Sequence, residues 1–461
     1  MLYIIVEKNT SRLNYVLEVF FSTVVSIPYQ VINLNTFYIL WEQPDIRAAA
    51  QEYSTLFFLN YSSFYLSNIF WMPPSGLLTE QEVYEHSYTI GHFENQVFYL
   101  EWENTNTGSL LPEVRPYWLP DFFAAAFYIL TEYEFMLAQQ GLGQRQLDIH
   151  KRLFYPANIL FQSQYYKTPV VESYVHYLLQ KLQVPSSLIQ YPKQQPWLVT
   201  VDIDSPWRYL YKGWCKNGGA LLRDSILFKF EAIRRRVGAL ITKKDPYATL
   251  ELFQEAFGRE NIIFFWLVGG VTKYDTSYVL SRHKQYAKYI QNYQEQDVMC
   301  ALHPSYAAAF DFSILEQEKA ALEKVIKKKV EYARFHFFRL HLPASRKALL
   351  RLGIFYDFTT ALVYDNGFLH GMARPFPWFD LEANTQTELI LFPTHVMDRT
   401  FISYQKLTPQ QALLQTWQVY EQVRIYKGCF TLLLHPPVAS GVEEWQDWKF
   451  YFNEIKTILT R

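Results

Sequence analysis

The second half of the chain repeats one pattern, a short apolar run followed by an amphipathic helical segment. The apolar runs lie at 197–203, 262–268, 298–303, 329–335, 353–362, 388–392 and 429–435. Helical patterns lie at 221–241, 247–257, 277–294, 315–329, 344–352, 409–426 and 445–459. Strands that alternate with helices pair in parallel, because the helix carries the chain back to the start of the next strand. The alternation therefore predicts an α/β fold whose parallel sheet is covered by helices.

The number of these units indicates how the sheet is arranged. Seven strand candidates lie between residue 196 and residue 461. A (β/α)8 barrel typically needs ~250 residues, so this region has the right size for a barrel related to that type. An open, doubly wound sheet is the alternative that the same pattern allows.

The first part of the chain has a different character. Residues 1–190 are aromatic and irregular, with strand-like pieces such as FYILW (37–41) and TLFFLNY (55–61), and helical patterns around 121–140 and 169–183. The segment PSSLIQYPKQQP (185–196) contains three prolines and several polar residues, which is typical of a linker. We therefore predict two domains, an aromatic-rich α+β domain at 1–190 and the barrel at 196–461.

Composition and charge exclude several classes of protein. The formal net charge is −1, which removes the electrostatic argument for nucleic acid or an anionic membrane as the main partner. The three cysteines, Cys215, Cys300 and Cys429, have no paired spacing, so neither a disulfide framework nor a cysteine zinc site is expected. The basic stretches EAIRRR and EKVIKKK lie late in predicted helices, where they complement the helix dipole, and are expected to be solvated.

No segment has the signature of a membrane span or a secretion signal. The longest apolar run, FFAAAFYIL at 122–130, falls far short of the ~20 residues that a spanning helix needs. The first residues, MLYIIVEKN, have too short an apolar stretch for a signal peptide and lack a basic region before it. We therefore expect a cytoplasmic protein without an integral membrane segment.

Polar side chains recur where the predicted strands end. Asp202 and Asp204 lie at the end of the first strand, and His303, His336 and His435 follow the third, fourth and last strands. Each residue alone is more typical of a structural side chain that hydrogen-bonds a neighbouring loop. The carboxyl ends of barrel strands meet at one face, where active sites lie. Their shared position therefore predicts one site.

The residue types in this group suit metal-assisted hydrolysis. Carboxylate oxygens and neutral imidazoles bind zinc-like divalent ions, and a catalytic site of this kind keeps one position open. Two close carboxylates repel one another, and a bound cation lets one act as a ligand and the other as a base. A separate histidine can then serve as the general acid for the leaving group.

An ordered series of motifs resembles the polysaccharide deacetylases, the nodulation-type carbohydrate esterase homology group. The resemblance is stronger to a divergent bacterial branch in which this domain follows an uncharacterised N-terminal domain. The matching pieces, in the family's order, are TVDIDSPWRYLYKG, GGALLRD, FFWLVGG, LHPSYAA, RFHFFRLHLPASRKALLRLGIFYDFTTA, GFLHGMARPFPWFDL, LFPTHVMDRTF and GCFTLLLH. They run from about residue 200 to residue 400, and GCFTLLLH with Trp445 and Trp448 extends the match to the end.

The resemblance implies a deformed (β/α)7 barrel and a metal-dependent hydrolase that removes acetyl groups from N-acetylated (or O-acetylated) sugars or polysaccharide precursors. Its bond class would be C–N bonds other than peptide bonds. The family's pattern makes Asp202 the base, Asp204 and His303 metal ligands, Arg334 the residue that orients the base, and His435 the general acid. The implied cofactor is a divalent metal ion, zinc before others.

The sequence departs from the family's pattern at three places. Ala307 stands where the family has its second ligand histidine, and His336 is the available substitute. Ile203 separates the two aspartates, which the family has side by side. Leu369 stands where the branch favours arginine, and His370 beside it either compensates or is a loop residue. These departures leave an alternative function, a catalytically silent glycan-binding or assembly module with the same fold.

Overall fold

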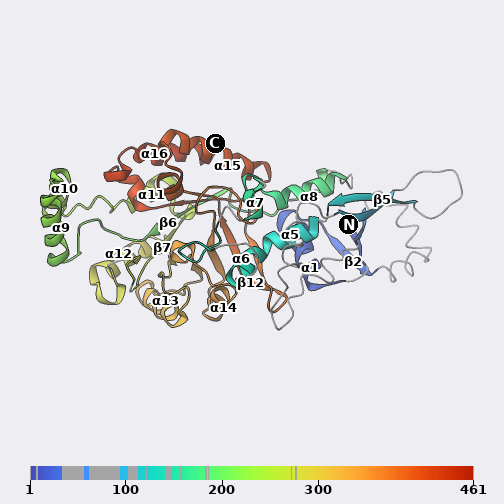
Figure 1. Ribbon diagram of the computed structural model, residues 1–461, viewed down its shortest axis with the longest axis horizontal. Helices are drawn as coiled ribbons and strands as arrows, with labels where there is room; N and C mark the ends of the chain where they lie inside the picture. Colours follow the sequence, from blue (N-terminus) through green and yellow to red (C-terminus); the bar gives the residue numbers. More distant parts are fainter. Residues whose placement is uncertain are drawn as a thin grey trace.

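The structure is a computed structural model of the chain, drawn in Figure 1. It describes residues 2–6, 9–33, 57–61, 94–101, 113–120, 122–141, 147–154, 158–162, 164–181, 184, 186–270, 272–275 and 278–459. Two sheets organise these residues, one of five strands from the first part of the chain and one of nine strands from the second. The predicted strand piece at 37–41 lies outside the described residues.

The nine-stranded sheet is almost entirely parallel and carries the polar strand ends. Its strands are β6 (Trp197–Ile203), β7 (Ile262–Trp266), β8 (Met299–Leu302), β9 (Tyr332–Ala333), β10 (Tyr356–Ala361), β11 (Phe376–Asp380), β12 (Thr385–Thr394), β13 (Val396–Met397) and β14 (Phe430–Leu434). Their order is β11-β12-β10-β9-β8-β7-β6-β14-β13, and only β11 runs antiparallel to its neighbour. The α/β prediction is confirmed, whereas a closed barrel is not, because this hydrogen-bonded order is open.

Helices pack on the outside of this sheet. They are α11 (Leu250–Phe257), α12 (Lys284–Glu295), α13 (Phe312–Ile326), α14 (Ala344–Arg351), α15 (Pro409–Ile425) and α16 (Trp448–Leu459). In Figure 1, α11, α15 and α16 lie along one side of the strands, and α12, α13 and α14 lie along the other. The apolar residues of these helices pack on the outward face of the strands, and together they form one large buried cluster.

The inward face of the sheet curls around a small core of its own. Alternate residues of β6, β7, β8 and β10 meet there, and the cluster contains Leu198, Ile263, Phe265, Ala301, Phe358 and Cys429. The guanidinium of Arg334 lies over the ring of Phe265 at 4.6 Å from its centroid. Strand β12 also comes close to β14 at its end, where the chain continues through His395 into β13 and the His395 N–H donates to the Thr431 carbonyl at 3.0 Å.

Most predicted elements of the second half are found, with three differences. Strand β9 keeps only two of the seven predicted residues, and β11 and β13 were not predicted. The single helix expected at 221–241 is two helices, α9 (Trp214–Ile226) and α10 (Phe230–Thr242), because the backbone turns at Phe228, whose φ is +50°. The arginines of EAIRRR consequently lie in the middle of α10 and not at its end, so the expected dipole role is wrong for them.

The first part of the chain builds the five-stranded sheet and several helices beside it. The strands are β1 (Leu2–Val6), β2 (Tyr29–Asn33), β3 (Phe57–Tyr61), β4 (Glu94–Glu101) and β5 (Glu113–Pro120), in the order β2-β1-β3-β4-β5. The helices are α1 (Ser11–Glu18), α5 (Phe122–Leu130), α6 (Tyr133–Gln139), α7 (Ile159–Gln162) and α8 (Val170–Lys181). Strand β1 pairs in parallel with β2 and β3, and β4 runs antiparallel to both of its neighbours.

The two parts of the chain share buried contacts. The Tyr15 hydroxyl donates to the Pro377 carbonyl at 2.9 Å, and Arg374 donates to the Val24 carbonyl at 2.8 Å. The division of the chain near residues 190–196 remains a prediction. Among the described helices, none is long and apolar enough to cross a bilayer.

Candidate metal and acid–base site

Five of the six predicted site residues line one cleft of about 570 Å³ at the carboxyl ends of the parallel strands. They are Asp202 and Asp204 at the end of β6, His303 after β8, His336 after β9 and His435 after β14. The sixth, Arg334, is fully buried behind Asp202. Backbone hydrogen bonds such as His303 N–H to Trp266 O (3.0 Å) and Arg334 N–H to Leu302 O (3.0 Å) continue the parallel pairing past the strand ends. This extension fixes where the side chains project.

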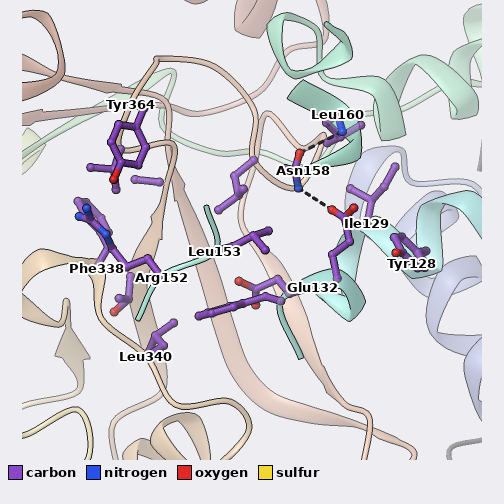
Figure 2. A pocket seen from close by; sticks show the side chains of 16 residues that line it. Tyr128, Ile129, Glu132, Arg152, Leu153, Asn158, Leu160, Phe338, Leu340 and Tyr364 are labelled. Carbon is purple, nitrogen blue, oxygen red and sulfur yellow. Dashed lines mark hydrogen bonds between the residues drawn. The ribbon is translucent and has the colours of Figure 1, made fainter. Parts of the chain in front are cut away.

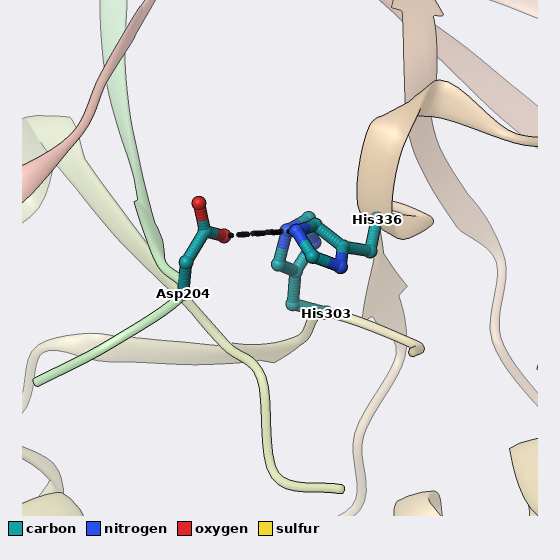
Figure 3. A group of neighbouring side chains, drawn as sticks. All are labelled: Asp204, His303 and His336. Atoms are coloured by element: carbon teal, nitrogen blue, oxygen red, sulfur yellow. Dashed lines mark ion pairs between the residues drawn. The ribbon is translucent and has the colours of Figure 1, made fainter. Parts of the chain in front are cut away.

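Asp204, His303 and His336 form a compact group of possible metal ligands (Figure 3). The Nε2 atoms of His303 and His336 lie 3.3 Å and 3.5 Å from Asp204 Oδ1. One ligand atom from each residue lies within 4.8 Å of the other two. Asp204 Oδ1 is buried and makes no hydrogen bond, although 41% of the whole side chain is exposed. A buried carboxylate oxygen without a donor is costly unless a cation occupies its surroundings.

The far side of each imidazole faces an acceptor, which only His303 reaches with a hydrogen bond. His303 Nδ1 lies 2.5 Å from the Arg334 carbonyl oxygen, and His336 Nδ1 lies 3.5 Å from Asp275 Oδ1. Because a carbonyl oxygen only accepts, His303 Nδ1 carries a proton, and the neutral form of this imidazole presents its Nε2 lone pair toward Asp204. Histidines that bind metals are usually oriented by such a contact on the other nitrogen. The donor set therefore suits a zinc-like ion.

Asp202 is fixed by a buried arginine. The Arg334 guanidinium donates to Asp202 Oδ1 at 2.8 Å, to Thr200 Oγ1 at 2.9 Å and to Thr394 Oγ1 at 3.1 Å. The second carboxylate oxygen of Asp202, Oδ2, lies 3.7 Å from His303 Nε2. Asp202 is thus paired on one oxygen and directed toward the metal-ligand group with the other.

His435 approaches the group from the end of β14, the strand that pairs with β6, and has a carboxylate behind it. Its Nδ1 lies 2.6 Å from Asp398 Oδ1, and its backbone N–H donates to Asp398 Oδ2 at 2.7 Å. Its Nε2 lies 3.8 Å from Asp204 Oδ2. Burial alone would lower the pKa of His435, but the charge and hydrogen bond of Asp398 outweigh it and raise that pKa to about 9. A histidine that holds its proton beside a cleft can donate it to a leaving group.

The surrounding imidazoles keep Asp204 ionised. Burial alone would raise the pKa of the Asp204 carboxyl, but the charges of His336, His435 and His303 outweigh it and hold the pKa well below its usual range. An ionised carboxylate at this point is the form that binds a cation.

Two residues of the site were missed from the sequence, Asp398 and Asp275. Asp398 follows β13 in the segment HVMDRTF. Its position at a strand end could have identified it, but the sequence pattern did not predict this two-residue strand. Asp275 lies in the loop after β7, accepts from Thr272 and from the Tyr306 backbone N–H, and no strand end marked it.

The structure also places the residues at which the sequence departs from the family. His336 Nε2 lies 3.5 Å from Asp204 Oδ1, and Ala307 lies in a turn, so the substitution of one for the other remains a prediction. His370 does not reach the cleft, because its Nε2 lies 3.3 Å from Glu132 Oε1 in a buried cluster. Leu369 lines a second, mainly apolar cavity of about 70 Å³, which shares Arg152 and Phe338 with the cleft (Figure 2).

Comparisons with known proteins give limited matches. Residues 2–186 match the model of a family of unknown function, DUF7033, so the match ends before the first site residue. No curated protein matches the chain. A solved structure from Mycobacterium smegmatis, assigned as a polysaccharide deacetylase, is similar at 14% identity over 58% of this chain and 86% of that chain, with a TM-score of 0.37. A TM-score of this size does not establish a shared fold, so the residues of the cleft carry the functional argument.

Proposed function

We propose that the protein is a metal-dependent hydrolase that removes acetyl groups from N-acetylated or O-acetylated sugars or glycan precursors. The observation that carries this proposal is the convergence of three imidazoles, from three strand ends, on the carboxylate of Asp204. Two of the imidazoles have their other nitrogen held within hydrogen-bonding distance of an acceptor. An amide or ester is the bond that such a set of base, acid and metal ligands can hydrolyse.

Asp204, His303 and His336 would hold the metal ion, and zinc suits this mixture of one carboxylate and two imidazoles. When bound, such an ion supplies Lewis acidity to the carbonyl under attack and to the attacking water. The buried, unpaired Asp204 Oδ1 is the observation of fit, since a cation satisfies an oxygen that no donor reaches.

The remaining residues divide the proton transfers between them. Asp202 takes a proton from the attacking water, and Arg334 keeps its carboxylate oriented through the 2.8 Å hydrogen bond. His435 gives its proton to the leaving nitrogen or oxygen, and Asp398 holds the imidazole so that Nε2 faces the cleft. Base and acid thus stand on different strands with the scissile bond between them.

The proposal is tested by metal content and acetate release. We expect near-stoichiometric zinc after reconstitution, measured by elemental analysis, and its loss in Asp204→Ala and His303→Ala. His435→Ala should retain zinc but release acetate about 10²–10⁴-fold more slowly from a panel of acetylated sugars. His341→Ala removes an exposed histidine that stacks on Phe310, and this control should change neither quantity.

Two outcomes would overturn parts of the proposal. No zinc in the unmodified protein after reconstitution, or zinc retained in both ligand variants, would contradict the metal site. Stoichiometric zinc without acetate from any donor, combined with binding of an acetylated glycan, would favour the silent glycan-binding module.

A further inference from the structure

Helices α9 and α10 form a hairpin that stands away from the rest of the molecule. Figure 1 shows both helices at one end of the long axis, beyond the sheet and the helices that cover it. Each helix packs mainly on the other, and the chain reverses between them at Leu227, Phe228 and Lys229. Residues 204–213 follow β6 and lead directly into the hairpin.

The polarity of this hairpin is inverted relative to an ordinary surface hairpin. Between the helices lie buried polar groups, in which Arg236 donates to Asn217 at 3.1 Å and to Asp224 at 3.1 Å. The solvent side instead carries large apolar residues, which are Leu222, Ile226, Leu227, Phe228, Phe230 and Ile241. Phe228 is 76% exposed and Phe230 70%. Five of these residues lie at 222–230, around the tip, where the rings of Phe228 and Phe230 contact one another at 6.2 Å between centroids. A group of exposed apolar residues of this kind marks a surface that contacts something other than water.

The same hairpin is strongly basic although the chain as a whole is not. Residues 214–244 contain eight basic and two acidic side chains, a net charge of +6, whereas the whole chain has −1. Both acidic side chains are already paired, Asp224 with Arg236 at 3.1 Å and Glu231 with Arg234 at 3.1 Å. The net excess is therefore positive, and it flanks the apolar tip through Lys229 and through Arg223, whose side chain is 67% exposed and also contacts Asp224 at 3.0 Å.

The two ends of the hairpin are joined to one another at its base. Asp245, just after α10, accepts the backbone N–H groups of Arg208, Tyr209 and Leu210, just before α9, at 2.7–2.9 Å. One buried carboxylate thus ties the entry of the hairpin to its exit. The apolar tip projects from the molecule on a fixed stalk.

We propose that the α9–α10 hairpin docks the protein on an anionic lipid surface. An apolar tip with aromatic residues, surrounded by Lys and Arg, is the composition of segments that lie in the bilayer interface. The tip enters the boundary between headgroups and acyl chains, and the flanking cations contact lipid phosphates. The charge complementarity favours this partner over an apolar protein surface, because each cation near such a surface adds binding energy.

The experiment is flotation of the full-length protein with vesicles made from equal parts of phosphatidylglycerol and phosphatidylcholine. We expect binding that weakens with added salt and is much weaker on vesicles of phosphatidylcholine alone. Phe228→Ser with Phe230→Ser should reduce partitioning by at least ~10-fold, since two exposed apolar anchors are lost. Arg223→Gln with Lys229→Gln, which leaves the apolar tip intact, should reduce it about 10–30-fold on the anionic vesicles.

A matched control uses apolar residues of similar exposure elsewhere. Leu414 and Ile425 on α15 are 57% and 59% exposed, and Leu414→Ser with Ile425→Ser should bind the vesicles as the unmodified protein does. Absence of binding to the anionic vesicles, or equal binding by both hairpin variants and the control, would overturn the proposal. A dimer in sedimentation velocity that Phe228→Ser with Phe230→Ser converts to monomer, without vesicle binding, would assign the face to a second copy.

Discussion

Two buried clusters of this molecule use the same residue types and differ in how completely their charges are matched. In the cleft, Arg334 pairs with Asp202, but Asp204 Oδ1 has only imidazoles near it. In the second cluster, where α5 and α6 meet the sheet, Arg346 lies between Glu132 and Asp357, at 3.0 Å from Asp357 Oδ2. We call this second group the junction cluster, and it includes His370 beside Glu132.

The difference separates a structural ion cluster from a candidate site. In the junction cluster, burial would raise the pKa of Glu132, but Arg346 and His370 outweigh it and lower that pKa to about 2. Both carboxylates there contact the Arg346 cation, although Arg346 Nη2 and the His370 nitrogens make no hydrogen bond among the described residues. The Arg346 side chain is 0% exposed and Glu132 8%. The cleft keeps a carboxylate oxygen unpaired and open volume beside it. Residue type alone thus does not identify a site, whereas an unmatched charge beside a cavity does.

The largest expected effect tests the junction cluster. Arg346→Met leaves Glu132 and Asp357 buried without a cation, and we expect the free energy of unfolding to fall by about 3–5 kcal/mol. Denaturant unfolding measures the change. The neighbouring Lys347 pairs with Asp380 at 3.1 Å at a side chain that is 30% exposed, so Lys347→Met should cost no more than about 1 kcal/mol. Equal losses in both variants would remove the distinction between buried and exposed pairs.

A buried histidine without any carboxylate extends the comparison. His395 accepts from the Thr431 N–H at 3.0 Å through Nδ1, and its Nε2 lies 3.2 Å from the Met372 carbonyl oxygen. Burial lowers its pKa to about 4, the opposite of His435. The neutral form is therefore favoured in the folded state, and this stability is complete above pH ~6.5 and lost as the pH falls toward 4.

We expect this histidine to contribute about 3 kcal/mol to the fall in unfolding free energy between pH 6.5 and 4. Unfolding of the unmodified protein and of His395→Asn across this range measures the contribution. The variant should start less stable at neutral pH and show the shallower decline. Parallel declines in the two proteins would assign the acid sensitivity to other groups.

The junction cluster and the cleft should respond differently to zinc. If Asp204 holds the ion with its two histidines, zinc at 100 times its Kd stabilises the fold by about 2.7 kcal/mol, because it binds the native state alone. Thermal unfolding with and without a chelator measures this shift. Asp204→Asn should abolish the zinc-induced shift. Glu132→Gln should lower the stability of the zinc-free protein but leave the size of the shift unchanged. A shift that survives Asp204→Asn would locate the ion elsewhere.

The smallest expected effect concerns the support of Asp202. Thr200→Val removes a hydroxyl that accepts from Arg334 at 2.9 Å and donates to the Leu432 carbonyl at 3.1 Å. We expect the free energy of unfolding to fall by about 1 kcal/mol. We also expect acetate release to become slower, because Arg334 and with it Asp202 lose a support. Thr416→Val removes a buried hydroxyl on α15, outside both clusters, and should lower stability alone. Unchanged acetate release in Thr200→Val would limit Thr200 to a structural role.

The strand ends could be predicted from the sequence, and with them the location of the cleft. Strand β6 coincides with the predicted run at 197–203, because five of its seven residues are apolar, which is typical of a strand covered on both faces. Asp202, His303 and His435 then follow from strand order alone. The roles of these residues, and of Arg334 and His336, remain predictions.

Other features depend on contacts that a linear pattern does not contain. Asp398 reaches His435 only because β13 pairs with β14, and β13 has two residues. The pairing of Glu132 with Arg346 joins positions more than two hundred residues apart. The break between α9 and α10 falls at Phe228, a residue type that rarely adopts positive φ and so gives no turn signal. The open order of the sheet likewise depends on which strands meet, not on their number.

Asp245 gives the hairpin one further property. Because a single carboxylate gathers the backbone before α9 and the residue after α10, the hairpin leaves and rejoins the sheet at one point. A segment anchored in this way can lengthen, shorten or change its surface during evolution while the strands on either side keep their register. The attachment of the molecule to its surroundings can therefore evolve independently of the strand ends that hold Asp202 and Asp204.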